Sequence, residues 1–134
     1  MDIITSYTYT VYAIASLASL MLVQLLIADI VGIRLKHIPG STIPSDHNNF
    51  LFRASRVVTN TNETIAIYIL AIVVCVFSNA SPQITAFISW AFVIARLCYA
   101  LCYYCNLKIL RSVIFGISLL ALIALLVTGI STWF

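Results

Sequence analysis

Four long apolar segments limit this chain to a small set of folds. They cover about Tyr7 to Ile33, Phe50 to Phe77, Pro82 to Tyr104 and Leu110 to Trp133, which is most of the 134 residues. A helix needs about 20 apolar residues to cross the hydrocarbon core of a bilayer, and each segment is long enough. We therefore predict an all-α membrane bundle of four transmembrane helices, with residues 1–134 forming a single domain.

Composition excludes the main alternatives. The chain is 63% hydrophobic and only 8% charged, whereas a soluble domain is roughly 25% charged. The apolar segments lack the alternation of polar and apolar residues that a transmembrane barrel requires. The first segment has no basic flank and is longer than the apolar part of a secretory signal, so we expect it to be a retained helix.

The basic residues predict the orientation of the helices. They gather in the first connection, at Arg34, Lys36, Arg53 and Arg56, and in the third, at Lys108 and Arg111, while the second connection has none. Cytoplasmic loops carry an excess of Lys and Arg. We therefore expect both termini on the non-cytoplasmic side, in a membrane such as the bacterial inner membrane. The net charge of +3 then reflects topology, and without a nucleic-acid-binding motif we expect no nucleic acid partner.

Prolines, glycine and small polar residues mark where the helices begin and end. HIPGSTIPSDHNN, residues 37–49, is typical of an irregular loop. Within it, Ser45 and Asp46 are the expected caps of the second helix, and the two histidines are expected to be solvated. Ser81 followed by Pro82 predicts the start of the third helix, and Asn106 predicts its end.

Polar side chains converge on one face of the second predicted helix. Arg53, Arg56, Asn60 and Glu63 follow one another at spacings of three, four and three. At about 100° per residue they span an arc of roughly 80°. Because ionisable groups inside a membrane are costly and usually face a cavity, we interpret this stripe as a ligand site that enters the bundle. The alternative is a set of salt bridges that fixes packing.

The third helix carries a similar face. Arg96, Tyr99 and Tyr103 lie three and four residues apart, and Arg96 is surrounded by apolar sequence. A guanidinium in such a setting needs a partner, for which Glu63 is the first candidate and Asp29 the second.

The combined side chains suit a small zwitterionic peptide. Arginines bind carboxylates through paired hydrogen bonds, a glutamate binds an ammonium group, and asparagine binds a peptide amide. Glutathione has two carboxylates and one amine, and its thiol ionises at neutral pH when a cation lies nearby. We therefore consider glutathione the candidate co-substrate.

Two motifs carry a family resemblance. FRASRVVTNTNE, residues 52–63, is similar to R-x-x-R-x-x-x-N-x-x-E at the start of a second helix. ARLCYALCYYCNLKILR, residues 95–111, is similar to A-R-x-x-Y-x-x-x-Y followed by an arginine that opens a fourth helix. In this order and on these helices, the chain resembles the MAPEG superfamily, the membrane-associated proteins in eicosanoid and glutathione metabolism.

That resemblance implies a homotrimer that binds glutathione between neighbouring subunits near the cytoplasmic side. The positions that match residues contacting glutathione or ordering its pocket are Arg53, Arg56, Asn60, Glu63, Tyr99 and Tyr103. Arg111 matches an arginine proposed to stabilise the thiolate, and Arg34 matches a basic residue near the pocket, so either is a candidate for that role. The implied activity is transfer of glutathione to lipophilic electrophiles, or reduction of lipid hydroperoxides, with the second substrate reached from the bilayer.

The sequence also allows other functions. Cys98, Cys102 and Cys105 share one side of the third helix, and CYYC has the spacing of a redox pair, which would suit a membrane thiol oxidoreductase. Its expected place at the cytoplasmic end disfavours a disulfide, so we interpret these cysteines as packing residues and predict no metal site. A non-catalytic regulator that binds glutathione or lipid, and a transporter that uses Glu63, are the remaining alternatives.

Overall fold

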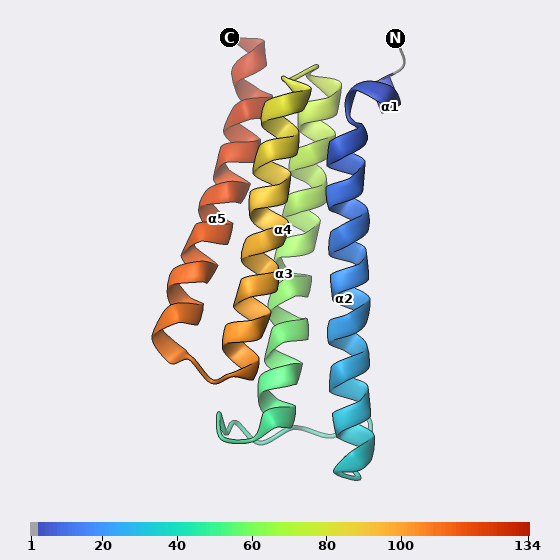
Figure 1. Ribbon diagram of the computed structural model, residues 1–134, viewed down its shortest axis with the longest axis vertical. Coiled ribbons are helices and arrows are strands. Elements are labelled where there is room, and N and C mark those ends of the chain that lie inside the picture. The colour runs from blue at the N-terminus through green and yellow to red at the C-terminus, as the bar shows by residue number, and fades with distance from the viewer. Residues whose placement is uncertain (1–2) are drawn as a thin grey trace.

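Residues 3–134 are described by the computed structural model, and they form four long helices (Figure 1). These are α2 (Thr8–Arg34), α3 (Phe50–Phe77), α4 (Pro82–Tyr104) and α5 (Lys108–Ile130), with short helical turns α1 (Ile3–Ser6) and η1 (Ser131–Trp133) at the two ends. Each long helix has the length and apolar composition needed to cross a membrane. The predicted all-helical, four-span architecture is confirmed, and α4 begins at the predicted proline.

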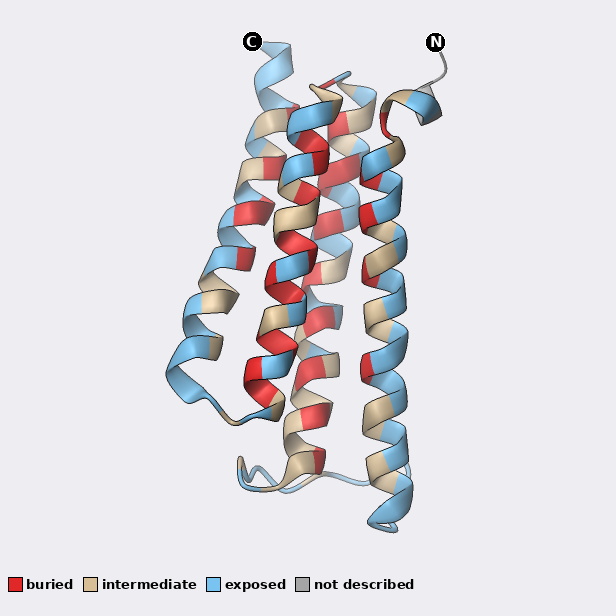
Figure 2. Ribbon diagram, in the orientation of Figure 1, coloured by how far each residue is buried: buried red, intermediate tan, exposed pale blue. Residues whose placement is uncertain are grey.

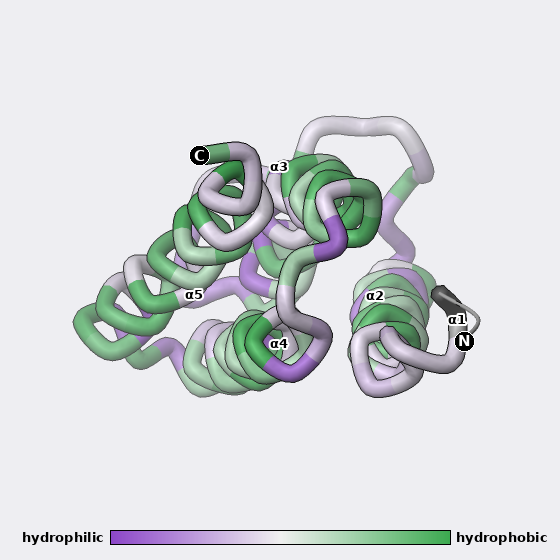
Figure 3. Tube along the Cα trace, turned by 90° about the horizontal axis from the view of Figure 1, so that it is seen from above, coloured by the Kyte–Doolittle hydropathy of each residue, from purple (hydrophilic) through white to green (hydrophobic). Residues whose placement is uncertain are grey.

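The two middle helices of the bundle are α3 and α4. α2 and α5 each pack against both of them, and they lie on opposite sides of the bundle (Figure 3). The α2–α3 and α4–α5 connections lie together at one end, and α1 and η1 lie at the other (Figure 1). The lysines and arginines in or near these two connections therefore gather at a single end of the bundle, which we call the basic end.

Three helices terminate in the same way. Lys36, Asn79 and Asn106 follow α2, α3 and α4 with φ of 53°, 51° and 58°. In each case the backbone amide of the following residue donates a hydrogen bond to a carbonyl in the last turn of the helix. After α4, for example, the Leu107 amide donates to the Cys102 carbonyl at 2.8 Å. This is the left-handed helix ending that satisfies otherwise unpaired carbonyls. The prediction that Asn106 ends the third helix is confirmed.

The start of α3 differs from the prediction. Asn49, rather than Ser45 or Asp46, is the capping residue, and its side-chain oxygen accepts from the Leu51 amide at 2.9 Å. The Asp46 carboxylate instead accepts from the Asn48 amide at 2.9 Å, within the loop. Several residues of this loop have side chains that suit a cap, and the turn after Asp46 decides which of them reaches the helix.

Buried residues lie on the inward face of each long helix (Figure 2). Leu17, Tyr68, Phe92 and Leu125 come from four different helices and are almost completely buried in one apolar cluster. The rings of Tyr68 and Phe92 stack with centroids 4.7 Å apart. Many large apolar side chains remain exposed on the outer faces, as expected where lipid rather than water surrounds the bundle.

Gly129 allows α5 to approach α3 closely. A Cβ atom at this position would lie 2.8 Å from Cγ1 of Val74 and 3.1 Å from the backbone nitrogen of Cys75. Small residues let membrane helices pack at short range. Gly116, on the same helix, has no atom within 4 Å of such a Cβ.

We expect Gly129→Ala to lower the free energy of unfolding by about 1–3 kcal/mol, because the added methyl group overpacks a tight helix contact. Gly116→Ala is the matched control and should be neutral or stabilising, since alanine is favoured over glycine in a helix by about 0.5–1 kcal/mol. Thermal unfolding of the detergent-solubilised variants measures both effects. Equal shifts in Tm would contradict the close approach at Gly129.

Candidate functional site

A small pocket lies among α3, α4 and α5 near the basic end. Its volume is 180 Å³, and its walls are Asn60, Tyr99, Tyr103, Arg111, Ser112 and Phe115. We call it the polar pocket. Of the eight residues predicted for the site, the structure places four in this wall.

Two arginines and two tyrosines form a continuous column beside the polar pocket. The Arg96 guanidinium lies 4.5 Å from the centre of the Tyr99 ring. The rings of Tyr99 and Tyr103 are 5.4 Å apart, and the Arg111 guanidinium lies 4.4 Å from the centre of the Tyr103 ring. We call this arrangement the arginine–tyrosine column. It places one cation in the pocket wall and a second one directly behind Tyr99.

Arg96 is completely buried, and its hydrogen-bond partners are hydroxyl groups. Its two terminal nitrogens donate to Oγ of Ser118 at 3.4 Å and to Oγ1 of Thr61 at 3.5 Å, while Nε has no partner. The predicted ion pair with Glu63 is wrong, because Glu63 lies on an exposed side of α3 and no ion pair joins it to Arg96 in residues 3–134. The Glu63 charge still attracts the Arg96 guanidinium from a distance. The faces of the flanking aromatic rings offset part of the missing countercharge.

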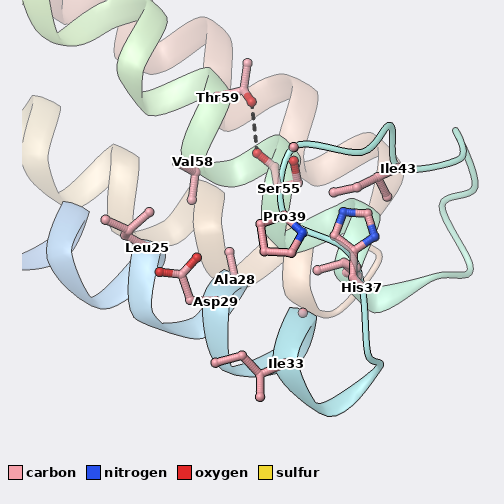
Figure 4. Close-up of a pocket in the computed structure, with 13 residues that line it drawn as sticks. Leu25, Ala28, Asp29, Ile33, His37, Pro39, Ile43, Ser55, Val58 and Thr59 are labelled. Atoms are coloured by element: carbon pink, nitrogen blue, oxygen red, sulfur yellow. Dashed lines mark hydrogen bonds between the residues drawn. The ribbon is translucent and has the colours of Figure 1, made fainter.

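The second candidate partner, Asp29, belongs to a different cavity. A pocket of 490 Å³ lies between α2, α3 and the α2–α3 loop. Figure 4 shows Asp29 at its wall with mostly apolar neighbours. Asp29 therefore does not pair with Arg96, and none of the eight predicted site residues lines this larger pocket.

Arg111 contacts a residue that the sequence did not single out for the site. Its Nη1 lies 3.3 Å from Nδ1 of His47, and the His47 ring is 6.1 Å from that of Tyr103. The prediction of a solvated His47 is therefore wrong, since its side chain is only partly exposed and packs against the wall of the polar pocket. The two residues are 64 positions apart, and no local pattern relates a loop residue to so distant a helix.

The predicted polar stripe of α3 lies beside the core rather than within it. The inward face of α3 consists of Ala54, Val57, Thr61, Thr64 and Tyr68. The stripe is rotated away from this face, so Asn60 reaches the polar pocket while Glu63 is exposed. Burying several charges without partners is costly, which explains why the stripe follows the edge of the bundle.

The remaining arginines lie outside the wall of the polar pocket. Arg53 donates to the carbonyls of His47 at 2.6 Å and Asn48 at 3.1 Å, so it holds the loop against α3. Arg56 is half-buried on the same helix. Arg34 is exposed at the end of α2, on the side of the bundle opposite α5 (Figure 3).

An unpaired acceptor gives the polar pocket its recognition chemistry. Oδ1 of Asn60 is buried and has no hydrogen-bond partner in the described chain. Arg111 uses one donor on His47, and a guanidinium has five. The pocket therefore offers donors to an anion and one acceptor to a polar N–H group, which together suit a peptide that carries negative charge.

A comparison with known protein families identifies the family of this chain. The model of the MAPEG family matches residues 11–131, which is nearly the whole chain. The chain belongs to the MAPEG family. The resemblance identified from the two motifs is thus confirmed, and with its four long apolar helices this MAPEG protein is an integral multi-pass membrane protein. No curated protein and no solved structure matches it.

The cysteines of this MAPEG protein are all free. Cys102 is buried and Cys105 is exposed, although they belong to the same CYYC sequence. In the part of the chain that the structure describes, no three His, Cys, Asp or Glu side chains are grouped closely enough to hold a metal ion.

Two threonines of α3 allow the Arg96 contact to be tested. Both back-bond to a carbonyl four residues earlier at 3.0 Å, but only Thr61 also accepts from Arg96. Thr61→Val should lower the free energy of unfolding by about 1–3 kcal/mol, because it leaves a buried charged donor unsatisfied. Thr59→Val removes the same back-bond at an exposed position and should have a much smaller effect. Thermal unfolding in detergent that ranks the two variants equally would contradict this account.

Proposed function

We propose that this MAPEG protein is a membrane-bound, glutathione-dependent transferase or peroxidase that acts on lipophilic electrophiles or lipid hydroperoxides. The observation that carries the proposal is the arginine–tyrosine column. Its two guanidinium groups make no ion pair with a carboxylate in residues 3–134, so the site has positive charge without a direct counter-ion. MAPEG proteins generally use glutathione, which would supply the missing anionic groups.

In this proposal each wall residue has a chemical task. Arg111 stabilises the glutathione thiolate, since a neighbouring cation favours the ionised thiol. Oδ1 of Asn60 accepts from a peptide N–H of the ligand. Tyr99 and Tyr103 shape the wall and carry the two guanidinium groups on their faces. Arg53 orders the site by holding the α2–α3 loop.

We further propose that the site is completed by a second copy of the chain, within the homotrimer that the family resemblance implies. Ligand pockets usually measure about 300–1,000 Å³, and the polar pocket has only 180 Å³. Arg34 and Glu63 are exposed and lie outside its wall. Contact between copies would enlarge the pocket and bring an Arg34 from the neighbouring copy toward it, whereas Arg56 and Glu63 would bind the carboxylates and amine of glutathione.

The reaction follows from a thiolate held at the membrane. In transfer, its sulfur forms a bond to an electrophilic carbon, and a leaving group departs or a double bond takes up a proton. In peroxide reduction, the sulfur attacks a peroxide oxygen and the O–O bond breaks to release an alcohol. A second glutathione then reduces the resulting sulfenic acid to disulfide and water. Lipid supplies the apolar substrate laterally, and we propose that the basic end faces the cytoplasm with both termini on the other side.

Replacing Arg111 tests the thiolate role. Arg111→Ala should lower kcat by on the order of 10²-fold, as when one preorganised donor to a developing anion is removed, while glutathione affinity changes little. Lys108→Ala, an exposed cation on the same helix, is the control and should retain activity. A glutathione-conjugation assay and a glutathione-dependent thermal shift on detergent-solubilised protein measure the two quantities. Equal loss of turnover and binding would assign Arg111 to binding instead.

Replacing Asn60 tests recognition. Asn60→Leu should raise the Kd for glutathione about tenfold, because the loss of one polar contact is worth roughly 1–1.5 kcal/mol. Asn62→Leu, at an exposed position two residues away that lies outside the polar pocket, is the matched control. Isothermal titration with glutathione compares them. Binding without turnover in the unaltered protein would favour a regulator, and absence of binding would contradict the proposed function.

A further inference from the structure

The end of the α2–α3 loop is fixed in a defined place above the polar pocket. Arg53 donates to the carbonyls of His47 and Asn48, and Asp46 accepts from the Asn48 amide. Asn49 then caps α3. A tight turn held at both sides therefore presents the His47 ring toward α4 and α5.

The His47 ring packs against three elements. It meets the ring of Phe52 edge-on at 5.1 Å, lies 6.1 Å from the ring of Tyr103, and places Nδ1 3.3 Å from Nη1 of Arg111. An arginine has no acceptor, so the hydrogen bond requires an unprotonated Nδ1. The contact therefore exists only with a neutral imidazole ring.

Loss of water and the surrounding charges favour the neutral form of His47. Loss of water around the ring lowers the pKa of His47, and so do the Arg111 and Lys108 cations of α5 and Arg56 of α3, while Asp46 in the loop acts in the opposite direction. Tyr103 is the group that faces it from α4. Loss of water and three cations together outweigh the one carboxylate, so the pKa of His47 lies below its ordinary value of 6.5.

We propose that neutral His47 is a positioning residue, which holds the Arg111 guanidinium on the face of Tyr103 in the wall of the polar pocket and releases it on protonation. The inference rests on the proposed function for its catalytic consequence, but the contact itself does not. Unprotonated His47 accepts a hydrogen bond from Arg111, and the Tyr103 ring holds the same guanidinium on its face. Protonated His47 loses its acceptor and becomes a second cation at hydrogen-bond distance, which repels Arg111.

The sign of the pH dependence follows from this contact. Because the pKa of His47 is lowered, the state in which His47 contacts Arg111 favours the neutral ring. The contact between His47 and Arg111 is fully present above pH 6.5 and is lost as the pH falls through the lowered pKa of His47. Turnover should therefore have an acid limb that belongs to His47, in addition to the titration of the glutathione thiol itself.

A direct titration tests the contact without any substrate. The chain has two histidines, so His37→Asn leaves His47 as the only histidine resonance in protein grown with isotope-labelled histidine. We expect the pKa of His47 to lie below 6.5 and to shift upward in Arg111→Gln, because a neighbouring cation is removed. Asp29→Asn, which removes a charge at the wall of the larger pocket, is the control and should leave the titration unchanged. A His47 titration that is insensitive to Arg111→Gln would overturn the proposal.

Two substitutions of His47 test its effect on turnover. His47→Asn keeps a side-chain acceptor near the place of Nδ1 and cannot titrate, so it should retain kcat at pH 7.5 and lose the His47 acid limb. His47→Ala should lower kcat about tenfold or more above pH 6.5 through misplacement of Arg111, with little change in KM for glutathione, and the difference from the unaltered protein should shrink as the pH falls and His47 becomes protonated. Equal loss of kcat in both variants would contradict positioning by the acceptor. If the unaltered protein shows no turnover, the proposed function fails, and the histidine titration alone decides this inference.

Discussion

The candidate site depends on two arginine cations that stack on tyrosine rings and make no ion pair with a carboxylate in residues 3–134. The chain has only seven basic residues, and one of them, Arg96, is completely buried. A cation–π contact is worth about 2 kcal/mol when it is desolvated, whereas burying an ion costs several kcal/mol. The aromatic faces and two hydroxyl groups therefore stabilise Arg96 only in part. A second cation, Arg111, completes the column, and an anionic ligand is the natural counterpart of both.

The fold places this charge where a ligand can reach it. α3 and α4 form the centre of the bundle, and α5 adds Arg111 from one side. The left-handed helix ending at Asn106 turns the chain sharply after α4, which keeps the α4–α5 connection short and lets the two helices share one pocket. The longer α2–α3 loop has enough residues to return across the basic end, and Arg53 fixes its last turn there.

Sequence alone predicted the helices well because a bilayer requires long apolar segments, and it predicted the meeting of Tyr99 with Tyr103 because spacing fixes a helix face. It could not predict partners that depend on how helices rotate against one another. Glu63 was expected beside Arg96, but α3 turns Thr61 inward instead. The sequence also could not predict where the α2–α3 loop packs. The place of His47 results from hydrogen bonds that Arg53 makes to backbone carbonyls, and such contacts have no sequence signature.

Photoaffinity labelling tests most directly whether the arginine–tyrosine column forms part of a peptide-binding site. A glutathione derivative with a photoreactive group is cross-linked to the detergent-solubilised protein, and the labelled peptides are mapped by mass spectrometry. We expect labelling that free glutathione competes away, on peptides that contain Asn60, Tyr103 or Arg111. Competed labelling confined to the larger pocket around Asp29, or labelling that glutathione does not reduce, would contradict the account.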